Sequence, residues 1–181
     1  MNTQNFLRII SMMVLFISIT AISSCGSDDE EAGPDEIVND EVSLEFTLDG
    51  TKQTAVFNSG SSFLALSDGE SSVLSGNGSL VSGQNYAVAI AFVGTSNGTY
   101  TLTNAAGEDD ENTNGMSLII LNGQNSVGYN AKNVTLEVTS YTVISLGQIV
   151  VKGTFSGTLE NEDTLEEVSI TNGSFVTGFT S

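Results

Sequence analysis

One loop of the sequence carries oxygen-bearing side chains at a spacing suited to calcium. In the polar stretch that ends at Gly115, Asp110, Asn112 and Asn114 occupy alternate positions just before the glycine. This pattern matches the first half of an oxygen-ligand calcium loop. The bidentate glutamate expected at the twelfth position is absent, because Leu121 stands there. We therefore expect either weak calcium binding with further ligands from elsewhere in the chain or, more simply, a solvated acidic loop.

The rest of the sequence lacks the residues of the common catalytic sets. It contains no histidine, and its only cysteine is Cys25, which excludes Ser-His-Asp and Cys-His nucleophiles and zinc sites. A glycoside hydrolase needs only two carboxylates, and fourteen acidic residues follow position 41. Most of these fall at expected turns or solvent-facing positions, and the chain has no tryptophan on which a sugar could stack. The sequence predicts a protein that is not an enzyme and that has no cofactor beyond weakly bound calcium.

Cys25 follows an apolar run that reads as an export signal. The run from Ile9 to Ile22 would form a helix of about 21 Å, too short for a hydrocarbon core of roughly 30 Å, and typical of a signal peptide. Ile22-Ser23-Ser24-Cys25 resembles the lipobox of bacterial lipoproteins. The resemblance implies that the Cys25 thiol is alkylated with diacylglycerol, that the chain is cut before it and that the new amine is acylated. The alternative is an ordinary secretory signal with an incidental cysteine.

The residues after Cys25 are strongly acidic. Eight of the 22 acidic residues lie between Asp28 and Glu41, and like charges keep such a segment extended and solvated. Ser27 to Glu31 also resembles the surface-export signal of Bacteroidota lipoproteins, and Gly26 agrees with delivery to the outer membrane. We therefore expect a signal peptide over 1–24, an acidic disordered tether over 25–41 and one domain over 42–181. The expected location is the outer membrane, anchored by lipid and exposed at the cell surface.

The charge balance limits the partners of this chain. The formal net charge is −18, with only four lysines and arginines, and contacts to phosphates require those residues. Nucleic acid and anionic lipid surfaces are therefore poor partners, so the only membrane contact expected is through lipidated Cys25. Cations, cationic peptides and neutral sugars remain, and the sequence does not choose between a carbohydrate and a protein partner.

From residue 42 onward, alternating apolar residues and turn signals predict strands. Val42 to Leu48 alternates with period two, and Asp49-Gly50 is a hairpin signal. Tyr86 to Val93 is the clearest central strand, with Tyr86, Val88, Ile90 and Phe92 on one face and Ala87, Ala89, Ala91 and Val93 on the other. Small apolar residues on that second face predict that it is covered too.

Further strands are expected along the whole domain. We place them at Thr51 to Phe57, Phe63 to Leu66, Val73-Leu74, Thr99 to Thr103, Met116 to Leu121, Val134 to Val143, Ile149 to Gly157 and Val168 to Phe179. Gly76-Asn77-Gly78 reads as turn punctuation, and Gly153 and Gly157 mark bends or close backbone approach. About ten short strands without a helix predict an all-β fold, an antiparallel β-sandwich or a flattened β-barrel.

Several strand-and-turn motifs resemble those of uncharacterised Bacteroidota surface lipoproteins. They are Phe46 to Gly50, Gly98 to Leu102, Gly153 to Leu159 and Thr171 to Phe175. The resemblance implies an all-β domain and no established activity. Asp163-Thr164-Leu165 is similar to the O-glycosylation signal of exported proteins in these bacteria, which implies a glycan on Thr164.

Three classes of function follow. The first is a lipid-anchored, non-enzymatic domain that binds a partner or serves as an accessory envelope component through its loops. The second is a barrel that holds a small apolar ligand beneath Tyr86, Val88, Ile90 and Phe92, a hypothesis that a filled core would contradict. The third is a carboxylate-dependent glycoside hydrolase, which requires two acidic side chains facing each other across one cleft.

Overall fold

The domain consists of ten antiparallel strands. The computed structural model describes residues 42–57, 61–106, 114–123, 125–145 and 147–178. The strands are β1 (Ser43–Leu48), β2 (Thr51–Val56), β3 (Ser62–Ser67), β4 (Ser71–Leu80), β5 (Asn85–Val93), β6 (Gly98–Leu102), β7 (Gly115–Asn122), β8 (Asn125–Ser145), β9 (Gln148–Asn161) and β10 (Glu167–Val176). Within these ranges no helix is long and apolar enough to cross a membrane.

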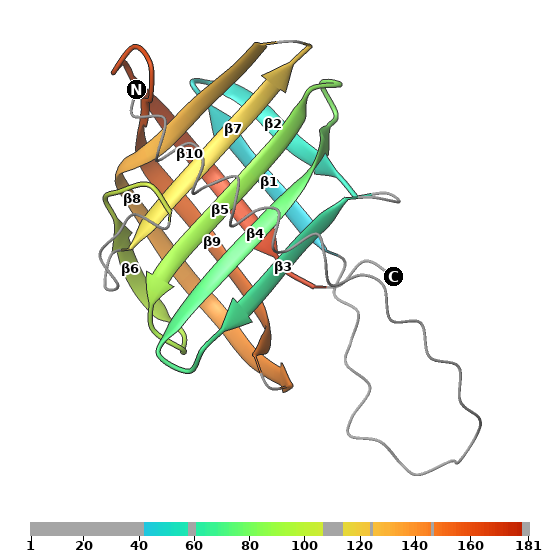
Figure 1. The fold of residues 1–181 in the computed structure, drawn as a ribbon, viewed down its shortest axis with the longest axis vertical. Coiled ribbons are helices and arrows are strands. Elements are labelled where there is room, and N and C mark those ends of the chain that lie inside the picture. The colour runs from blue at the N-terminus through green and yellow to red at the C-terminus, as the bar shows by residue number, and fades with distance from the viewer. Residues whose placement is uncertain (1–41, 58–60, 107–113, 124, 146, 179–181) are drawn as a thin grey trace, which may run out of the picture. The chain divides into compact units, whose positions relative to one another are not determined.

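The strands form a closed barrel. Going around the wall, β1, β2, β4, β5, β7, β8, β9 and β10 each pair with the next, and β10 pairs back to β1. The remaining two strands each share a pairing partner with another strand. β2 and β3 pair one after the other along the same edge of β4, and β7 and β6 pair one after the other along the same edge of β8. The fold is thus an up-and-down barrel of eight strands, two of them interrupted (Figure 1). The all-β prediction is confirmed, and of its two architectures the chain adopts the barrel.

The two ends of the barrel carry different turns. At the upper end in Figure 1 lie the four hairpins β1–β2, β4–β5, β7–β8 and β9–β10. At the lower end β1 begins at Ser43 and β10 finishes, so there β3 pairs directly with the start of β9. The chain therefore enters the barrel at the end opposite to the four hairpins.

One apolar cluster lines the interior. Alternate residues of the strands point inward, and Phe46, Phe155, Phe175 and Phe63 form a chain of ring contacts with centroids 6.0 to 6.3 Å apart. Eight strands give a barrel just wide enough for side chains to fill or for one small ligand. Core residues come from nine of the ten strands, and the inward-facing Ala55 of β2 packs against them. Every strand of the closed wall therefore contributes to the same core.

Inward-facing glycines let this core close. An added Cβ on Gly153 would lie 2.3 Å from the Glu137 carbonyl oxygen, and one on Gly157 would lie 2.1 Å from that of Asn133. The predicted close backbone approach at both positions is confirmed. The turn predicted at Gly76-Asn77-Gly78 is wrong. Both glycines lie within β4, where they leave room for the rings of Phe63 and Tyr86.

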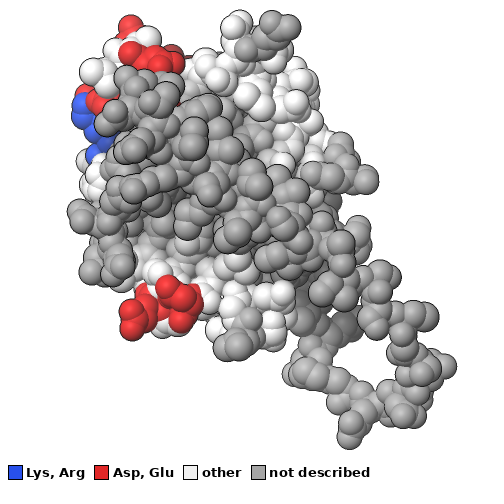
Figure 2. Space-filling view, in the orientation of Figure 1, with Lys and Arg blue, Asp and Glu red and all other residues white. Residues whose placement is uncertain are grey.

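Charge divides the barrel into two halves. All charged residues within strands lie on the contiguous strands β8, β9, β10, β1 and β2, which we call the charged half: Glu45, Lys52, Lys132, Glu137, Lys152, Glu160 and Glu167. The strands β3 to β7, the uncharged half, carry none. In Figure 2 the visible acidic atoms form an upper and a lower group, with lysine atoms beside the upper one, and the other described atoms are white.

Candidate functional site

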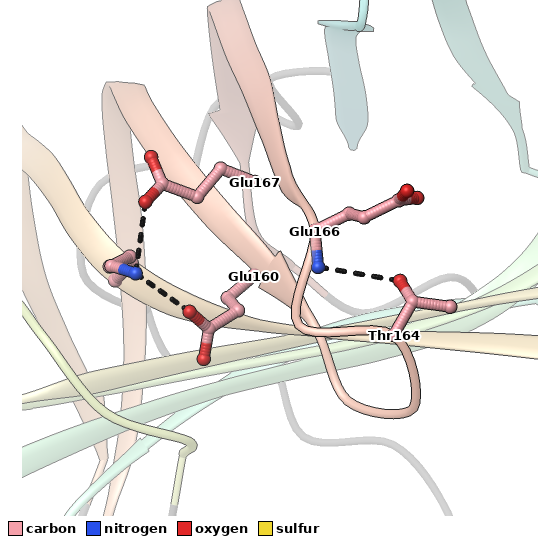
Figure 3. Close-up of polar contacts among 5 residues, drawn as sticks. Glu160, Thr164, Glu166 and Glu167 are labelled. Atoms are coloured by element: carbon pink, nitrogen blue, oxygen red, sulfur yellow. Dashed lines mark hydrogen bonds and ion pairs between the residues drawn. The ribbon is translucent and has the colours of Figure 1, made fainter.

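The β9–β10 hairpin holds Thr164 at the upper end of the barrel. The Oδ1 atom of Asn161 accepts hydrogen bonds from the amides of Asp163 and Thr164, both at 2.9 Å, and the Asn161 carbonyl accepts one from Leu165 at 3.0 Å. Thr164 Oγ1 accepts a hydrogen bond from the amide of Glu166 at 3.3 Å (Figure 3). All residues of the turn are exposed, so a modifying enzyme could reach the Thr164 hydroxyl without unfolding the hairpin.

Leu165 is unusual within the same turn. Its φ is +59°, in the left-handed region that disfavours side chains larger than glycine, and 67% of its surface is exposed. Asn161 fixes this conformation, because it bonds three successive amides of the turn. The hairpin therefore presents a leucine side chain to solvent in a fixed position.

Lys132 joins the two strands that flank this hairpin. Its Nζ lies 2.7 Å from Glu160 Oε2 and 2.9 Å from Glu167 Oε1 (Figure 3). These two hydrogen-bonded carboxylates raise the pKa of Lys132 above its usual range. Glu160 and Glu167 are cross-strand partners on β9 and β10, side by side on one sheet rather than across a cleft as a two-carboxylate hydrolase requires. Here a lysine binds both carboxylates on an exposed surface, and no acidic side chain of the described residues is buried.

Asn114 is the one described member of the predicted calcium set. Its Oδ1 accepts a hydrogen bond from the Val93 amide at 2.8 Å, and its carbonyl accepts one from the Thr103 amide at 3.1 Å. The side chain thus ties the start of β7 to the end of β5. A metal ion would have to share this oxygen. Asp110 and Asn112 lie outside the described residues, so calcium binding stays a prediction, and the described residues hold no metal-ligand cluster.

The barrel interior contains two polar atoms that the sequence did not single out. Tyr86 is 1% exposed, and burial raises the pKa of its hydroxyl to about 12. Neither this hydroxyl nor the buried Oε1 of Gln53 has a hydrogen-bond partner among the described residues. Both side chains point inward, since Gln53 pairs with core residue Phe46 and Tyr86 belongs to the core. Unpaired buried polar atoms are rare in folded proteins and call for an explanation.

The four residues of the predicted ligand site, Tyr86, Val88, Ile90 and Phe92, all lie on the inner side of the closed barrel. All four side chains belong to the buried apolar cluster, and the Phe92 ring lies 4.5 Å from that of Tyr100, centroid to centroid. Tyr86 belongs to this set and carries one of the two unpartnered polar atoms of the described residues, so the small-ligand site stays a prediction with which the barrel fold agrees.

A shallow groove lies on the outside of the charged half. Its volume is about 510 Å³, and it is open to solvent. It forms where the register of β10 shifts between Ile170 and Gly173, and Asn172 there has a φ of +52°. Hydroxyl and amide side chains dominate its lining, which consists of Thr154, Phe155, Ser156, Thr171, Asn172, Gly173 and Ser174. The strand predicted from Val168 to Phe179 is therefore interrupted at Asn172-Gly173 by a bulge.

Comparison with known proteins gives no relative: no family model, no curated protein and no solved structure matches this chain. Cys25 and the acidic tether also lie outside the described residues. The functional argument therefore rests on the chemistry of the sequence and the geometry of the barrel. The contact between Lys132 and two carboxylates and the pair of unpartnered interior atoms depend on cross-strand neighbours, which residue types alone do not reveal.

Proposed function

We propose that this chain is a lipid-anchored outer-membrane protein, exposed at the cell surface, whose barrel binds a partner or serves as an accessory component without catalysing a reaction. The observation that carries the proposal is the separation of the two barrel ends. The chain enters at Ser43 at the lower end, and the four hairpins lie at the upper end. A chain anchored through Cys25 would present those hairpins away from its tether.

Two of these hairpins, β1–β2 and β9–β10, suit a presenting role because hydrogen bonds hold their turns. Asp49 and Gly50 both have positive φ, as the tight β1–β2 turn requires, and the Asp49 amide bonds the Ser169 carbonyl of β10 at 2.8 Å. Asn161 fixes the β9–β10 turn as described above. Loops that are already ordered lose less entropy on binding a partner.

The anchor is tested with the full-length chain in a bacterium that processes lipoproteins. We expect the wild type to partition into detergent with the membrane fraction, and Cys25→Ser to appear in the aqueous fraction with its signal uncleaved or cleaved elsewhere. Added protease should degrade the wild type on intact cells. Equal partitioning of both proteins would refute the lipid anchor, and full protection on intact cells would refute surface exposure while leaving the anchor in place.

Glycosylation of Thr164 has a separate test in a Bacteroidota host. The mature protein should be heavier than its sequence mass by one glycan, and Thr164→Ala should remove that increment. Thr158→Ala is a matched control, because Thr158 lies on β9 in the same sheet and outside the motif. An unmodified wild-type mass would refute the prediction.

Calcium is the first ligand to test on the purified domain. A ligand that binds only the folded state adds about 2.7 kcal/mol at 100 times its Kd. If the acidic loop is a site, calcium should raise the melting temperature relative to chelator, and Asp110→Ala should abolish that increase. No shift for the wild type would leave the acidic stretch as a solvated loop.

A second candidate function is a barrel that takes up a small ligand with a polar end. The eight-stranded barrel fold is consistent with it, and the unpartnered Tyr86 hydroxyl and Gln53 Oε1 favour it. A ligand carrying one hydrogen-bond donor, such as a short-chain alcohol or amide, would satisfy Gln53. We expect such a ligand to raise the melting temperature of the wild type and to lose its effect in Gln53→Leu. A shift of equal size in both proteins would refute an interior site.

A further inference from the structure

The outer surface of the uncharged half forms a regular array of small and apolar side chains. Cross-strand rows run over β3, β4, β5 and β7, for example Leu66–Val73–Ala91 and Leu64–Ser75–Ala89. We call this surface the uncharged face; it consists of Leu64, Leu66, Val73, Ser75, Asn77, Ala87, Ala89, Ala91, Val93, Ile119 and Leu121. The face contains no Lys, Arg, Asp or Glu.

Four of the eleven residues of the uncharged face are exposed, and the other seven are half-buried. Val73, Val93 and Leu121 are 37%, 40% and 38% exposed, values high for large apolar side chains. All ten strands take part in the barrel wall, so no described strand remains to lie across it. Along β7 the face has a border, because the Ala106 amide bonds Ser117 Oγ at 3.1 Å. The sequence predicted that this face is covered, and the described residues supply no cover beyond that border.

Charge decides what kind of occupant fits. From Val42 onward the chain has three lysines and fourteen acidic residues, so two copies repel each other wherever their charged halves meet. A charged partner would gain no ion pair on the uncharged face and would lose hydration there. The residues between Cys25 and Val42 are a poor cover for the same reason, since eight of them are acidic. The occupant must present an equally uncharged, small-residue surface.

We propose that the uncharged face binds the same face of a second copy of this chain. A two-fold contact brings the same patch together from both copies, so a self-complementary surface without charge suffices. The stripe Ala87–Ala89–Ala91 runs along β5, and at its centre Ala89 lies between Ser75 of β4 and Ser117 of β7, so only small side chains stand at the middle of the face. Two such sheets can approach to about 10 Å, as aligned sheets do in sandwiches. Ala89 lies at the centre of the contact.

The size of the face indicates a weak dimer. Four strands about 4.8 Å apart and about eight residues long give a patch of roughly 19 by 25 Å, or about 500 Å² per copy. Two copies would bury about 1,000 Å², the lower limit for a specific interface. Repulsion between the two acidic domains opposes association and is screened by salt, whereas apolar contact is not. Dimerisation should therefore strengthen with added salt.

The test uses residues 39–181, which form one compact unit containing the whole core. Sedimentation should show a monomer at about 10 µM and a mass approaching twice that at about 1 mM, with more dimer at about 500 mM than at about 20 mM NaCl. Ala89→Glu should remain monomeric throughout. Thr135→Glu adds the same charge on an exposed position of β8 and should dimerise like the wild type.

A second measurement does not depend on the charge variants. The unit from Asn39 has no cysteine, so Ala89→Cys carries a single thiol. Two such thiols, oxidised by an added oxidant, should form an intermolecular disulfide, and Thr135→Cys should form far less. Any one of three results would overturn the proposal. They are a monomer at all concentrations, equal cross-linking of the two cysteine variants, and dimerisation of residues 39–181 that vanishes in a chain beginning at Gly26. The last result would assign the face to the tether, and binding of neutral lipid vesicles lost in Ala89→Glu would assign it to a membrane.

Discussion

The two halves of the barrel enclose one shared core but differ in their outer surfaces. The charged half contains the two longest strands, β8 and β9, which pair over most of their length through three register shifts. Its charges pair across strands, as Lys52 does with Glu45 at 3.0 Å and Lys132 with two glutamates. The uncharged half has shorter strands and no charge. Charged side chains on one half favour contact with water. The lack of charge on the other half agrees with the contact proposed between the uncharged faces of two copies.

The halves also differ in how they fill the interior. Three of the four rings in the phenylalanine chain come from β1, β9 and β10 of the charged half. The uncharged half contributes aliphatic side chains from β4, β5 and β7 along with Tyr86 and Phe92. Stability should therefore depend most on the charged half, and four predictions test this, from the largest expected effect to the smallest.

Removing the central ring of the charged half should have the largest effect. Phe155 contacts both Phe46 and Phe175, so Phe155→Ala should lower the free energy of unfolding by about 3–5 kcal/mol, since it leaves a cavity. Denaturant unfolding measures the change. Phe92→Ala is the matched comparison in the uncharged half, because it removes the same side chain from a position that is 1% exposed. Its cost should be lower, since the Phe92 ring contacts the half-buried Tyr100 rather than two buried rings. Equal losses would contradict a core centred on the charged half.

Adding one methyl group at a backbone contact should have the next largest effect. In Gly153→Ala the new Cβ would meet the Glu137 carbonyl, which cannot move without disturbing the β8–β9 ladder. We expect a loss of about 1–3 kcal/mol, the usual range for overpacking. Gly128→Ala is the matched control on β8, because its Cβ would meet only the Glu162 carboxylate, the end of a flexible side chain. Similar losses in both variants would contradict this account.

Tyr86→Phe tests the polar interior of the uncharged half. If the hydroxyl is unpaired, its removal should leave stability near neutral pH unchanged or raise it by about 1 kcal/mol. Destabilisation would instead indicate a bound polar partner, as the ligand-binding function requires. The pKa of Tyr86 is raised to about 12 from 10.0, so the unfolded state releases the proton first. Wild-type stability should fall between about pH 10 and 12, by about 3 kcal/mol in total, and Tyr86→Phe should fall less.

Breaking the surface ion pairs of the charged half should have the smallest effect. Lys132→Met removes the contact with Glu160 and Glu167 on an exposed surface, where salt bridges contribute little. The raised pKa of Lys132 means that its stabilisation is present at neutral pH and is lost as pH rises through the folded-state pKa. We expect a small fall in melting temperature that disappears in high salt. A large fall in melting temperature that does not depend on salt would show that these ion pairs contribute substantially to stability.

Much of the wall was predictable from local sequence, and the misses have a common cause. The Asp49-Gly50 hairpin and the strand over Tyr86 to Val93 follow from turn chemistry and alternation, and both are present. The first part of β8, from Asn125 to Asn133, was missed because it is polar and contains Gly128. It forms a strand because β7 and β9 pair with it on both sides. Pairing on two edges overrides weak strand propensity.

Of the candidate sites, the sequence located the ones built from neighbouring residues. Thr164 was singled out by its neighbours Asp163 and Leu165 and lies in an exposed turn, whereas its glycosylation stays a prediction. Three features were not predicted. They are the ion pairs of Lys132 with Glu160 and Glu167, the inward position of Gln53 and the division of charge between the two halves. Each of these joins residues on different strands, and a one-residue change of register would separate them or turn the side chain to the other face.

The sequence by itself determined most of the strands and the tight turns, because these depend on the φ angles and alternation of adjacent residues. It also set the acidic balance and the single cysteine. The need for glycine at Gly76 and Gly78 was decided by the rings of Phe63 and Tyr86 that lie against them. Only the tertiary structure decided that the strands close into a barrel, since closure depends on β10 reaching β1 after more than a hundred residues. The same long-range pairing brings the uncharged strands together into one face, and it does so because strand register, unlike strand formation, is fixed by partners far away in the chain.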